Sequence, residues 1–211
     1  MFNAISKILK KDEEMTELDE EVAKLLYDYQ MQLKDSVIKN DMLRIFVAKV
    51  EEFTVTESNG QHSRCLLIRL PYKSIDPFRN IRNNVVGHLE RKMNCTVIVV
   101  GIRTILSKRV PTPGIRIRPR SRTLTHVYDR LLEDVALPSS IVGKQIRMHT
   151  DGSQTMKIFL DPLDKDKVED RLDAMAEAYR KCTNRKVKFF FSKPTRFQKA
   201  LAEFKKRQKQ Q

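Results

Sequence analysis

Several features are scarce in this chain of 211 residues, and each scarcity excludes a class of protein. Tryptophan is absent and aromatic residues make up only 7%, which argues mildly against a surface that stacks nucleic-acid bases. The longest apolar run, TVIVVGI at 96–102, is far shorter than the ~20 residues of a membrane-spanning helix. The first residues, MFNAISKILKKDEE, contain no apolar stretch of signal-peptide length. We therefore expect an intracellular protein that does not insert into a membrane.

Cysteine is rare as well. Cys65, Cys95 and Cys182 lie far apart, and no C-x-x-C pair is present. The four histidines show no metal-ligand spacing either. The sequence therefore predicts neither a disulfide nor a metal site.

Catalytic motifs are also missing. The chain has no glycine-rich phosphate-binding loop, no G-x-S-x-G and no H-E-x-x-H. Glu133 and Asp134 are adjacent on a predicted helix and point to different faces, which suits surface charge better than paired acid–base work. His126 has no catalytic partner in the pattern, so we interpret it as phosphate-facing or merely exposed. The sequence predicts no enzyme, no cofactor and no small-molecule substrate.

What the chain does have is positive charge. Its 41 lysines and arginines exceed its 27 acidic residues, so the formal net charge is +14 and the isoelectric point about 9.8. An excess of this size favours a nucleic acid or an anionic membrane as partner. With 40% apolar residues, the chain can form one sizeable core or two small ones.

The cations concentrate in a connector at 106–122, which ends in the stretch RIRPRSRTLT at 116–125. No acidic residue occurs between Arg91 and Tyr128. Arginine offers a planar fork that two phosphate oxygens can accept together. We therefore predict RNA-binding residues in the connector, and the alternative is a solvated basic loop; the residues are Lys108, Arg109, Arg116, Arg118, Arg120 and Arg122.

Hydrophobic periodicity predicts helices and strands in a recurring order. The expected helices cover 12–35, 77–93, 124–137 and a segment that starts at Asp161-Pro162. The expected strands cover 44–56, 64–71, 95–102, 143–150, 154–160 and 185–191, with hairpin turns at Asn59-Gly60 and Asp151-Gly152. The order helix, hairpin, helix, strand occurs twice, without a residue-level repeat.

This order predicts an α/β (α+β) fold with mixed sheets and two similar halves joined by the basic loop. The halves are expected at 1–105 and 123–191, with a right-handed crossover between parallel strands in the first. The pattern leaves open whether the halves share one sheet. A basic amphipathic tail follows at 192–211.

Three further expectations concern the surface. In the strand at 143–150, Ile146 and Met148 should point inward and Arg147 outward. The first helix has an acidic face, interpreted as a protein-facing side or, as the simpler alternative, a solvated one. Second-rank candidates for RNA contacts lie on the later hairpin and in the tail, namely Lys144, Arg147, Lys193 and Arg196.

Several runs of residues together resemble one family. They are RPRSRTLT (118–125), LED (132–134), P-S-x-I-V-G-K-x-I-R (138–147), DGS (151–153) and K-x-x-L-D (157–161). With the layout above, they resemble the eukaryotic small-subunit ribosomal protein S7e (eS7) family over about 1–191. The central loop is shorter and poorer in lysine than is usual for that family, and the tail after Phe191 is longer.

The resemblance implies a structural component of the cytosolic small ribosomal subunit. It implies an α/β protein on the outer side of the subunit body, in contact with ribosomal RNA and neighbouring ribosomal proteins. It further implies a part in small-subunit assembly in the nucleolus, with assembly factors as partners and without catalytic activity. A free-standing RNA-binding assembly adaptor is the alternative, because it would share every charge feature.

Overall fold

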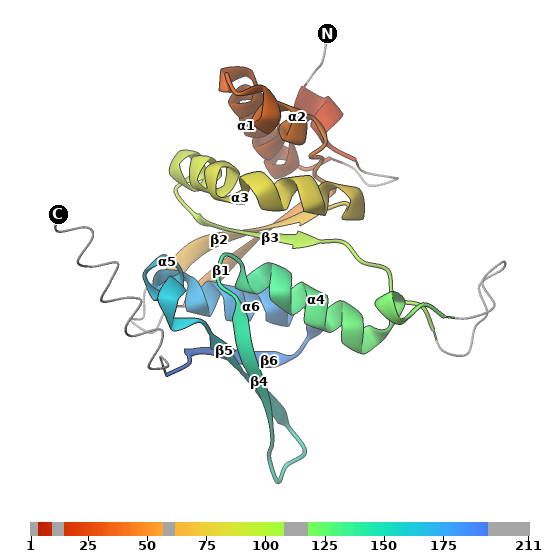
Figure 1. Cartoon of the computed structure of the whole chain (residues 1–211), viewed down its shortest axis with the longest axis vertical. Coiled ribbons are helices and arrows are strands. Elements are labelled where there is room, and N and C mark those ends of the chain that lie inside the picture. Colours follow the sequence, from red (N-terminus) through yellow and green to blue (C-terminus); the bar gives the residue numbers. More distant parts are fainter. Residues whose placement is uncertain (1–3, 10–14, 57–61, 108–117, 194–211) are drawn as a thin grey trace. The chain divides into compact units, whose positions relative to one another are not determined.

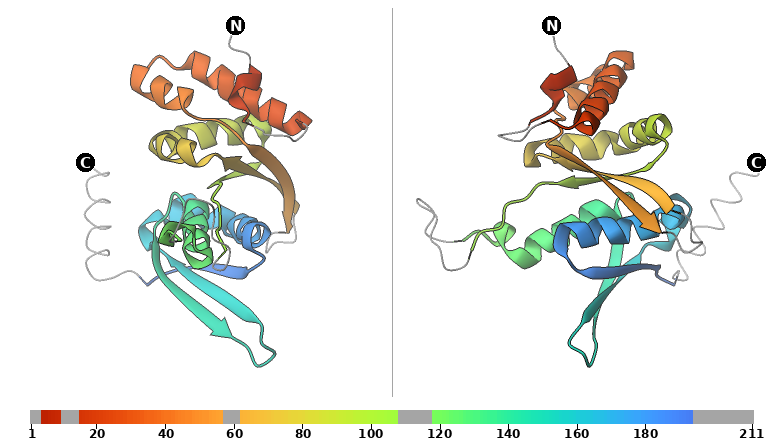
Figure 2. Two further views of the ribbon diagram at one scale, coloured as in Figure 1. Left: turned by 90° about the vertical axis from the view of Figure 1, so that its right-hand side faces the viewer. Right: turned by 180° about the vertical axis from the view of Figure 1, so that it is seen from behind.

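The computed structural model describes residues 4–9, 15–56, 62–107 and 118–193 (Figure 1). The chain divides into two compact units, Met1–Val135 and Ala136–Gln211. Figure 2 shows the elements of both units in two further views. None of the described helices is long and apolar enough to cross a membrane. The predicted turn at Asn59-Gly60 and most of the predicted tail lie outside the described residues.

The first unit contains a three-stranded sheet and the helices that cover it. Its strands are β1 (Lys49–Thr56), β2 (His62–Leu70) and β3 (Thr96–Gly101). Its helical elements are η1 (Ala4–Lys7), α1 (Glu17–Gln32), α2 (Ser36–Leu43), α3 (Tyr72–Met93), η2 (Arg120–Arg122) and α4 (Leu124–Ala136). β1 pairs antiparallel with β2, and β2 pairs parallel with β3, as predicted for a hairpin followed by a crossover helix.

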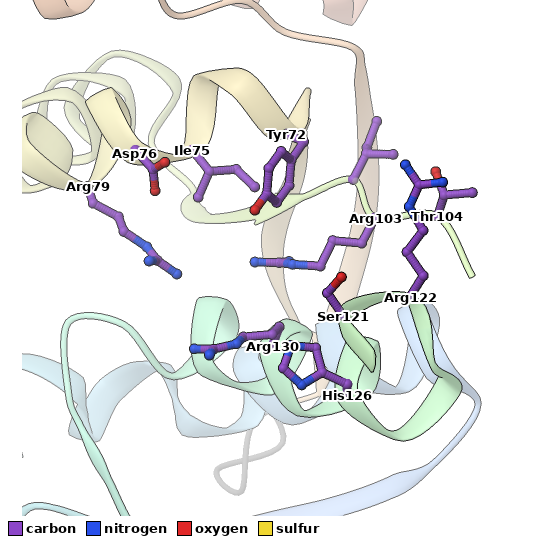
Figure 3. Close-up of a pocket in the computed structure, with 11 residues that line it drawn as sticks. Tyr72, Ile75, Asp76, Arg79, Arg103, Thr104, Ser121, Arg122, His126 and Arg130 are labelled. Atoms are coloured by element: carbon purple, nitrogen blue, oxygen red, sulfur yellow. The ribbon is translucent and has the colours of Figure 1, made fainter. Parts of the chain in front are cut away.

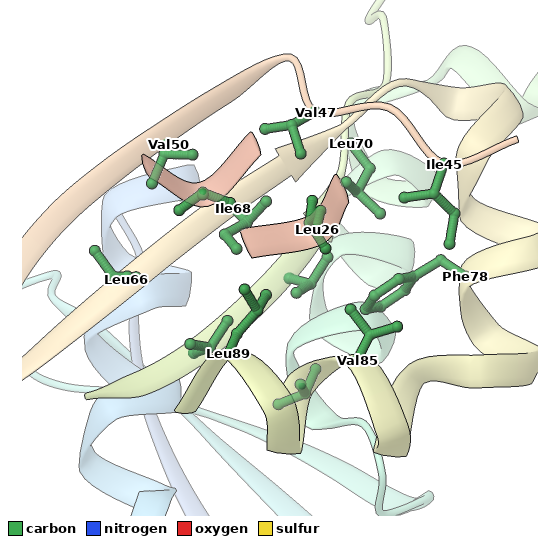
Figure 4. Packing of buried hydrophobic residues seen from close by; sticks show 14 of the residues in the cluster. Leu26, Ile45, Val47, Val50, Leu66, Ile68, Leu70, Phe78, Val85 and Leu89 are labelled. Carbon is green, nitrogen blue, oxygen red and sulfur yellow. The ribbon is translucent and has the colours of Figure 1, made fainter. Parts of the chain in front are cut away.

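The core of this unit lies between the sheet and the helices α1, α2 and α3 (Figure 4). Ile68 and Leu70 of β2 point toward Phe78 and Val85 of α3, and Leu26 of α1 packs into the same cluster. A capping box at Thr16 starts α1, where the Asp19 carboxylate accepts from Thr16. The second oxygen of that carboxylate accepts from the Val50 backbone N–H at 2.8 Å, so it also ties α1 to β1.

The second unit repeats this pattern of strands. Its strands are β4 (Ile141–Met148), β5 (Gln154–Leu160) and β6 (Lys186–Phe191), in the order β4-β5-β6. β4 and β5 are antiparallel, and β5 and β6 are parallel. The segment between β5 and β6 forms η3 (Pro162–Asp164), α5 (Lys165–Val168), η4 (Glu169–Arg171) and α6 (Leu172–Thr183). The two described sheets are separate, and the predicted α+β class is confirmed.

Some predicted elements differ from the structure. The first helix ends at Gln32, a helix that was not predicted, α2, follows it, and the strand predicted from 44 begins only at Lys49. The predicted start at Asp76-Pro77 is wrong, because α3 begins at Tyr72 and Pro77 lies inside it. A proline so near the start of a helix removes one backbone hydrogen bond without ending the helix. The start at Asp161 is confirmed, since its side chain accepts from the Leu163 N–H, although a 3₁₀ turn follows.

Two predicted faces were also wrong. Ile146 and Met148 are 49% and 73% exposed, although alternation placed them inward. They share the face of Met156 and Ile158, but they lie near the turn end of the hairpin, which extends beyond α6 (Figure 1). Within the acidic first helix, Asp19 is buried as a cap and does not belong to an acidic surface.

Candidate nucleic-acid interface

The described part of the arginine-rich stretch forms a short ordered turn immediately before α4. Pro119 is extended, and η2 (Arg120–Arg122) leads through Thr123 into α4. The Thr123 hydroxyl donates to the Arg120 carbonyl at 2.7 Å. Arg120 and Arg122 are exposed and Arg118 is half-buried. The turn therefore holds two guanidinium groups in solvent at the start of a helix.

The two ends of the connector are fastened together. The Leu106 N–H, after β3, donates to the Arg122 carbonyl at 3.0 Å. Ile102, the first residue after β3, donates its N–H to the Leu70 carbonyl at 2.8 Å, which fixes the outgoing end to β2. The arginine turn is thus anchored to the edge of a sheet.

A buried carboxylate holds the same region. Asp134 of α4 is only 3% exposed, so the prediction that it is helix-surface charge was wrong. Its oxygens accept from the Gly101 N–H at 3.1 Å, from Arg103 Nη1 and from Arg79 Nη2 at 3.1 Å. A Cβ at position 101 would lie 2.1 Å from Ile75 Cδ1, so any larger residue there would force the Ile75 side chain to move. Asp134 thereby joins α3, the end of β3 and α4.

Next to this carboxylate lies a cavity of about 580 Å³ (Figure 3). Its charged lining is cationic except for one carboxylate, that of Asp76. The cations come from α3, from the segment after β3, from η2 and from α4; they are Arg79, Arg103, Arg122 and Arg130, with His126 between them. Tyr72, Thr104 and Ser121 add hydroxyl groups.

These cations are not equally available to a ligand. Asp134 neutralises Arg103, whose side chain is only 9% exposed. The other oxygen of the same carboxylate pairs with Arg79. Arg130 pairs with Glu133 at 2.7 Å on the exposed side of α4. Exposed pairs of this kind are weak and exchange readily for a phosphate. Arg122, Arg130 and His126 are therefore the groups best placed to receive an anion in this cavity.

The sequence did not identify Arg79, Arg103 and Arg130 as members of this site. Two signals pointed toward it. His126 and Arg130 are four residues apart and share one face of α4. Arg103 is the second residue after the buried strand β3, where a cation needs a carboxylate partner.

The remaining predicted RNA-binding residues fall into two groups. Lys144 and Arg147 are exposed on β4, and Lys193 is exposed after β6. The structure places these three in the second unit and the arginine turn in the first. Four predicted residues lie outside the described part of the chain, namely Lys108, Arg109, Arg116 and Arg196.

The described residues also bear on metal binding and on cysteine reactivity. Within that part of the chain, no group of three His, Cys, Asp or Glu side chains could hold a metal ion. The three cysteines described there form no disulfide with one another, and burial raises the pKa of the Cys95 thiol, which makes it a poor nucleophile.

Comparison with known proteins identifies the family. The family model described as ribosomal protein S7e matches residues 6–191. Proteins named small ribosomal subunit protein eS7 are similar along nearly the whole chain. The one from Avicennia marina is 39% identical over 194 residues, which is 90% of this chain and 98% of its own. The one from Schizosaccharomyces pombe is 34% identical, over 90% of this chain and 96% of its own. The chain therefore belongs to the ribosomal protein S7e family, as its motifs predicted, and this is a family of structural ribosomal proteins and not of enzymes.

Proposed function

We propose that this protein is a structural constituent of the cytosolic small ribosomal subunit and binds ribosomal RNA through the arginine turn at 118–122. The turn and the adjoining cavity position RNA by its phosphates, a kind of contact that fixes register without reading bases. Specificity then comes from RNA shape and from neighbouring ribosomal proteins. We further propose that the chain joins the subunit during nucleolar assembly, together with assembly factors.

The observation that carries this proposal is the anchoring of the arginine turn. Arg120 and Arg122 are exposed on a turn that is bonded through the Arg122 carbonyl to Leu106, in the segment that follows β3, and Ile102 of that segment is bonded to β2. Arg122 and Arg130 line the same cavity from η2 and α4. Cations held on rigid elements lose less conformational entropy on binding than those on a free loop. This arrangement suits a fixed phosphate position in a folded RNA.

A protein-facing side is proposed on α1. Glu17, Glu21 and Asp28 are exposed there, and Asp19 is not part of that surface. An acidic helix repels phosphate, so this side should face a basic protein neighbour rather than RNA.

The test combines incorporation with a salt titration. Replacing Arg118, Arg120 and Arg122 together by alanine should reduce the protein's recovery in small subunits after a high-salt sucrose gradient. In RNA binding, the slope of log affinity against log salt should fall by roughly 2 to 3, at 0.7–0.9 for each lost phosphate contact.

The matched control removes the same charge elsewhere. Lys34, Lys39 and Arg44 are exposed at the ends and on the surface of α2 in the same unit. The variant with alanine at these three positions should be incorporated into small subunits like wild type and should keep the same slope of log affinity against log salt. An equal loss in both variants would mean that only net charge matters. Wild-type protein that leaves the subunit in high salt would indicate an assembly adaptor instead.

A further inference from the structure

The sheet of the second unit has one face that no described element of that unit covers. α6 packs on β6 from one side, where Met156, Ile158, Leu160, Val187 and Phe189 are buried. In Figure 2, no described helix of the unit lies on the opposite side of β6. Side chains alternate between the faces of a strand, so the residues between these buried ones form the outer face.

The strand register arranges this outer face in three rows. The row nearest the hairpin turn is Arg147, Thr155 and Lys186, and the middle row is Gln145, Lys157 and Lys188. The third row is Gly143, Phe159 and Phe190. Within the three strands, no acidic side chain belongs to this face. It therefore presents four cations beside two aromatic rings.

The two rings form a pair that solvent can reach. The centroids of Phe159 and Phe190 lie 6.3 Å apart with a tilt of 36°, and Phe190 is 39% exposed. Lys157 Nζ lies 5.3 Å from the centroid of the Phe190 ring. Gly143 has no side chain to cover Phe159 from the β4 side, although a Cβ there would fit, at 3.7 Å from that ring. Exposed aromatic rings of this size are stabilised when another flat ring stacks on them and covers them from water.

We infer that this outer face binds a short single-stranded RNA segment, with bases stacked on Phe159 and Phe190 and phosphates on Lys157 and Lys188. Aromatic side chains on an open sheet flanked by cations are how proteins bind unpaired nucleotides. Alternate residues of one strand are ~6.7 Å apart, so an aromatic row and a lysine row can serve the base and phosphate of one nucleotide. Arg147 and Lys186 extend the phosphate track. This site lies in the other unit from the arginine turn and goes beyond the proposed function.

An acidic protein segment would match the charges but not the two rings. Carboxylates gain little from an aromatic face, whereas every base has a face that stacks. The combination of rings and lysines therefore favours RNA over an acidic partner.

The test uses the absence of tryptophan from the chain. In full-length protein, Phe190→Trp introduces a single indole, and a stacked base should quench its fluorescence when an RNA of about eight nucleotides is added. Tyr27→Trp, at a half-buried position on α1, is the matched reporter that should not respond. Equal quenching at both positions, or quenching at neither, overturns the inference.

Affinity gives a second readout, measured by the anisotropy of the same labelled RNA. Phe190→Leu keeps apolar bulk and removes the ring, so binding should weaken about five- to tenfold with an unchanged melting temperature. Lys157→Gln with Lys188→Gln should weaken binding, while Lys165→Gln with Lys167→Gln on α5 should not. Unchanged affinity in the leucine variant, or equally strong competition by polyglutamate, overturns the inference. The triple arginine variant should keep most of this binding, so failure here is distinct from failure of the proposed function.

Discussion

Three donors converge on the Asp134 carboxylate, two from the end of β3 and the residues after it and one from α3. The sequence showed only an acidic pair, Glu133-Asp134, near the end of a helix. One of the two pairs with Arg130 in solvent, and the other is buried against Arg103. The helical period did offer a signal that was overlooked, because Asp134 lies seven residues after the buried Val127, on the same side of α4, whereas Glu133 lies on another side.

Replacing Asp134 by asparagine should destabilise the protein by about 3 kcal/mol. The amide keeps the shape but leaves the guanidinium of Arg103 buried without a charge partner, which is the costly way to break a buried pair. Urea unfolding measures the loss. Glu133→Gln is the adjacent control and should change the free energy of unfolding by less than ~0.5 kcal/mol. Similar effects in both variants would show that Asp134 is not a structural anchor.

Lys7 is a buried cation at the other end of the unit. Its ammonium donates to the Met42 carbonyl at 2.6 Å and lies 3.4 Å from the Ile45 carbonyl. It thus fixes η1 against the end of α2. Burial lowers the pKa of Lys7 from 10.5 to about 8.

This lowered pKa predicts a pH dependence of stability. Between pH 8 and pH 10.5 the unfolded chain keeps a proton that the folded chain has released, so the Lys7 contribution to stability rises with pH in that window. The free energy of unfolding of wild type relative to Lys7→Met should rise by about 2 to 3 kcal/mol across the window. Groups common to both proteins, such as Cys95, cancel in this difference.

The control for this titration is Lys39→Met, at an exposed position on α2. The rise for Lys7→Met should exceed any change for Lys39→Met over the same pH range. A flat difference for Lys7→Met would mean that the buried amine does not change its protonation on folding.

At the scale of elements, local chemistry predicted most of the fold. Alternation placed β5 correctly, with Met156, Ile158 and Leu160 buried, and the unbroken apolar run of β3 is buried on both faces. The order of the strands recurs as expected. One recurring signal was overlooked, since α3 and α6 both end at an asparagine with positive φ, Asn94 and Asn184, just before a parallel strand. Asparagine at this position is a known helix stop.

The predictions that were wrong concern residues whose position depends on tertiary contacts and not on the local sequence pattern. Ile146 and Met148 alternate like core residues, but no described helix of the second unit reaches their end of the hairpin (Figure 1). The start of α3 was misplaced because a proline after an aspartate is a common helix start, and Pro77 sits inside the helix instead. For the site, the sequence identified the arginine turn but not Arg79 or Arg130, which only folding brings to the same cavity.

At the scale of the whole molecule, each unit has a core and a sheet of its own. Leu66 is fully buried at the centre of the first sheet, and Ile158 is fully buried at the centre of the second. The chain divides after Val135 into these two compact units. Local opening of one unit should therefore be separable from opening of the other.

Hydrogen exchange of two matched core variants checks this independence. Ile158→Ala should cost about 3 kcal/mol and should accelerate exchange in β4, β5 and β6, while β2 and β3 keep their protection. Leu66→Ala should produce the reverse pattern, with losses confined to the first sheet. Because the arginine turn belongs to the first unit and the aromatic face to the second, the first variant should weaken single-stranded RNA binding and spare the salt-dependent contacts of the turn. Loss of protection in both sheets from either variant would show a single cooperative unit, and either variant would then be expected to weaken both of the proposed RNA contacts.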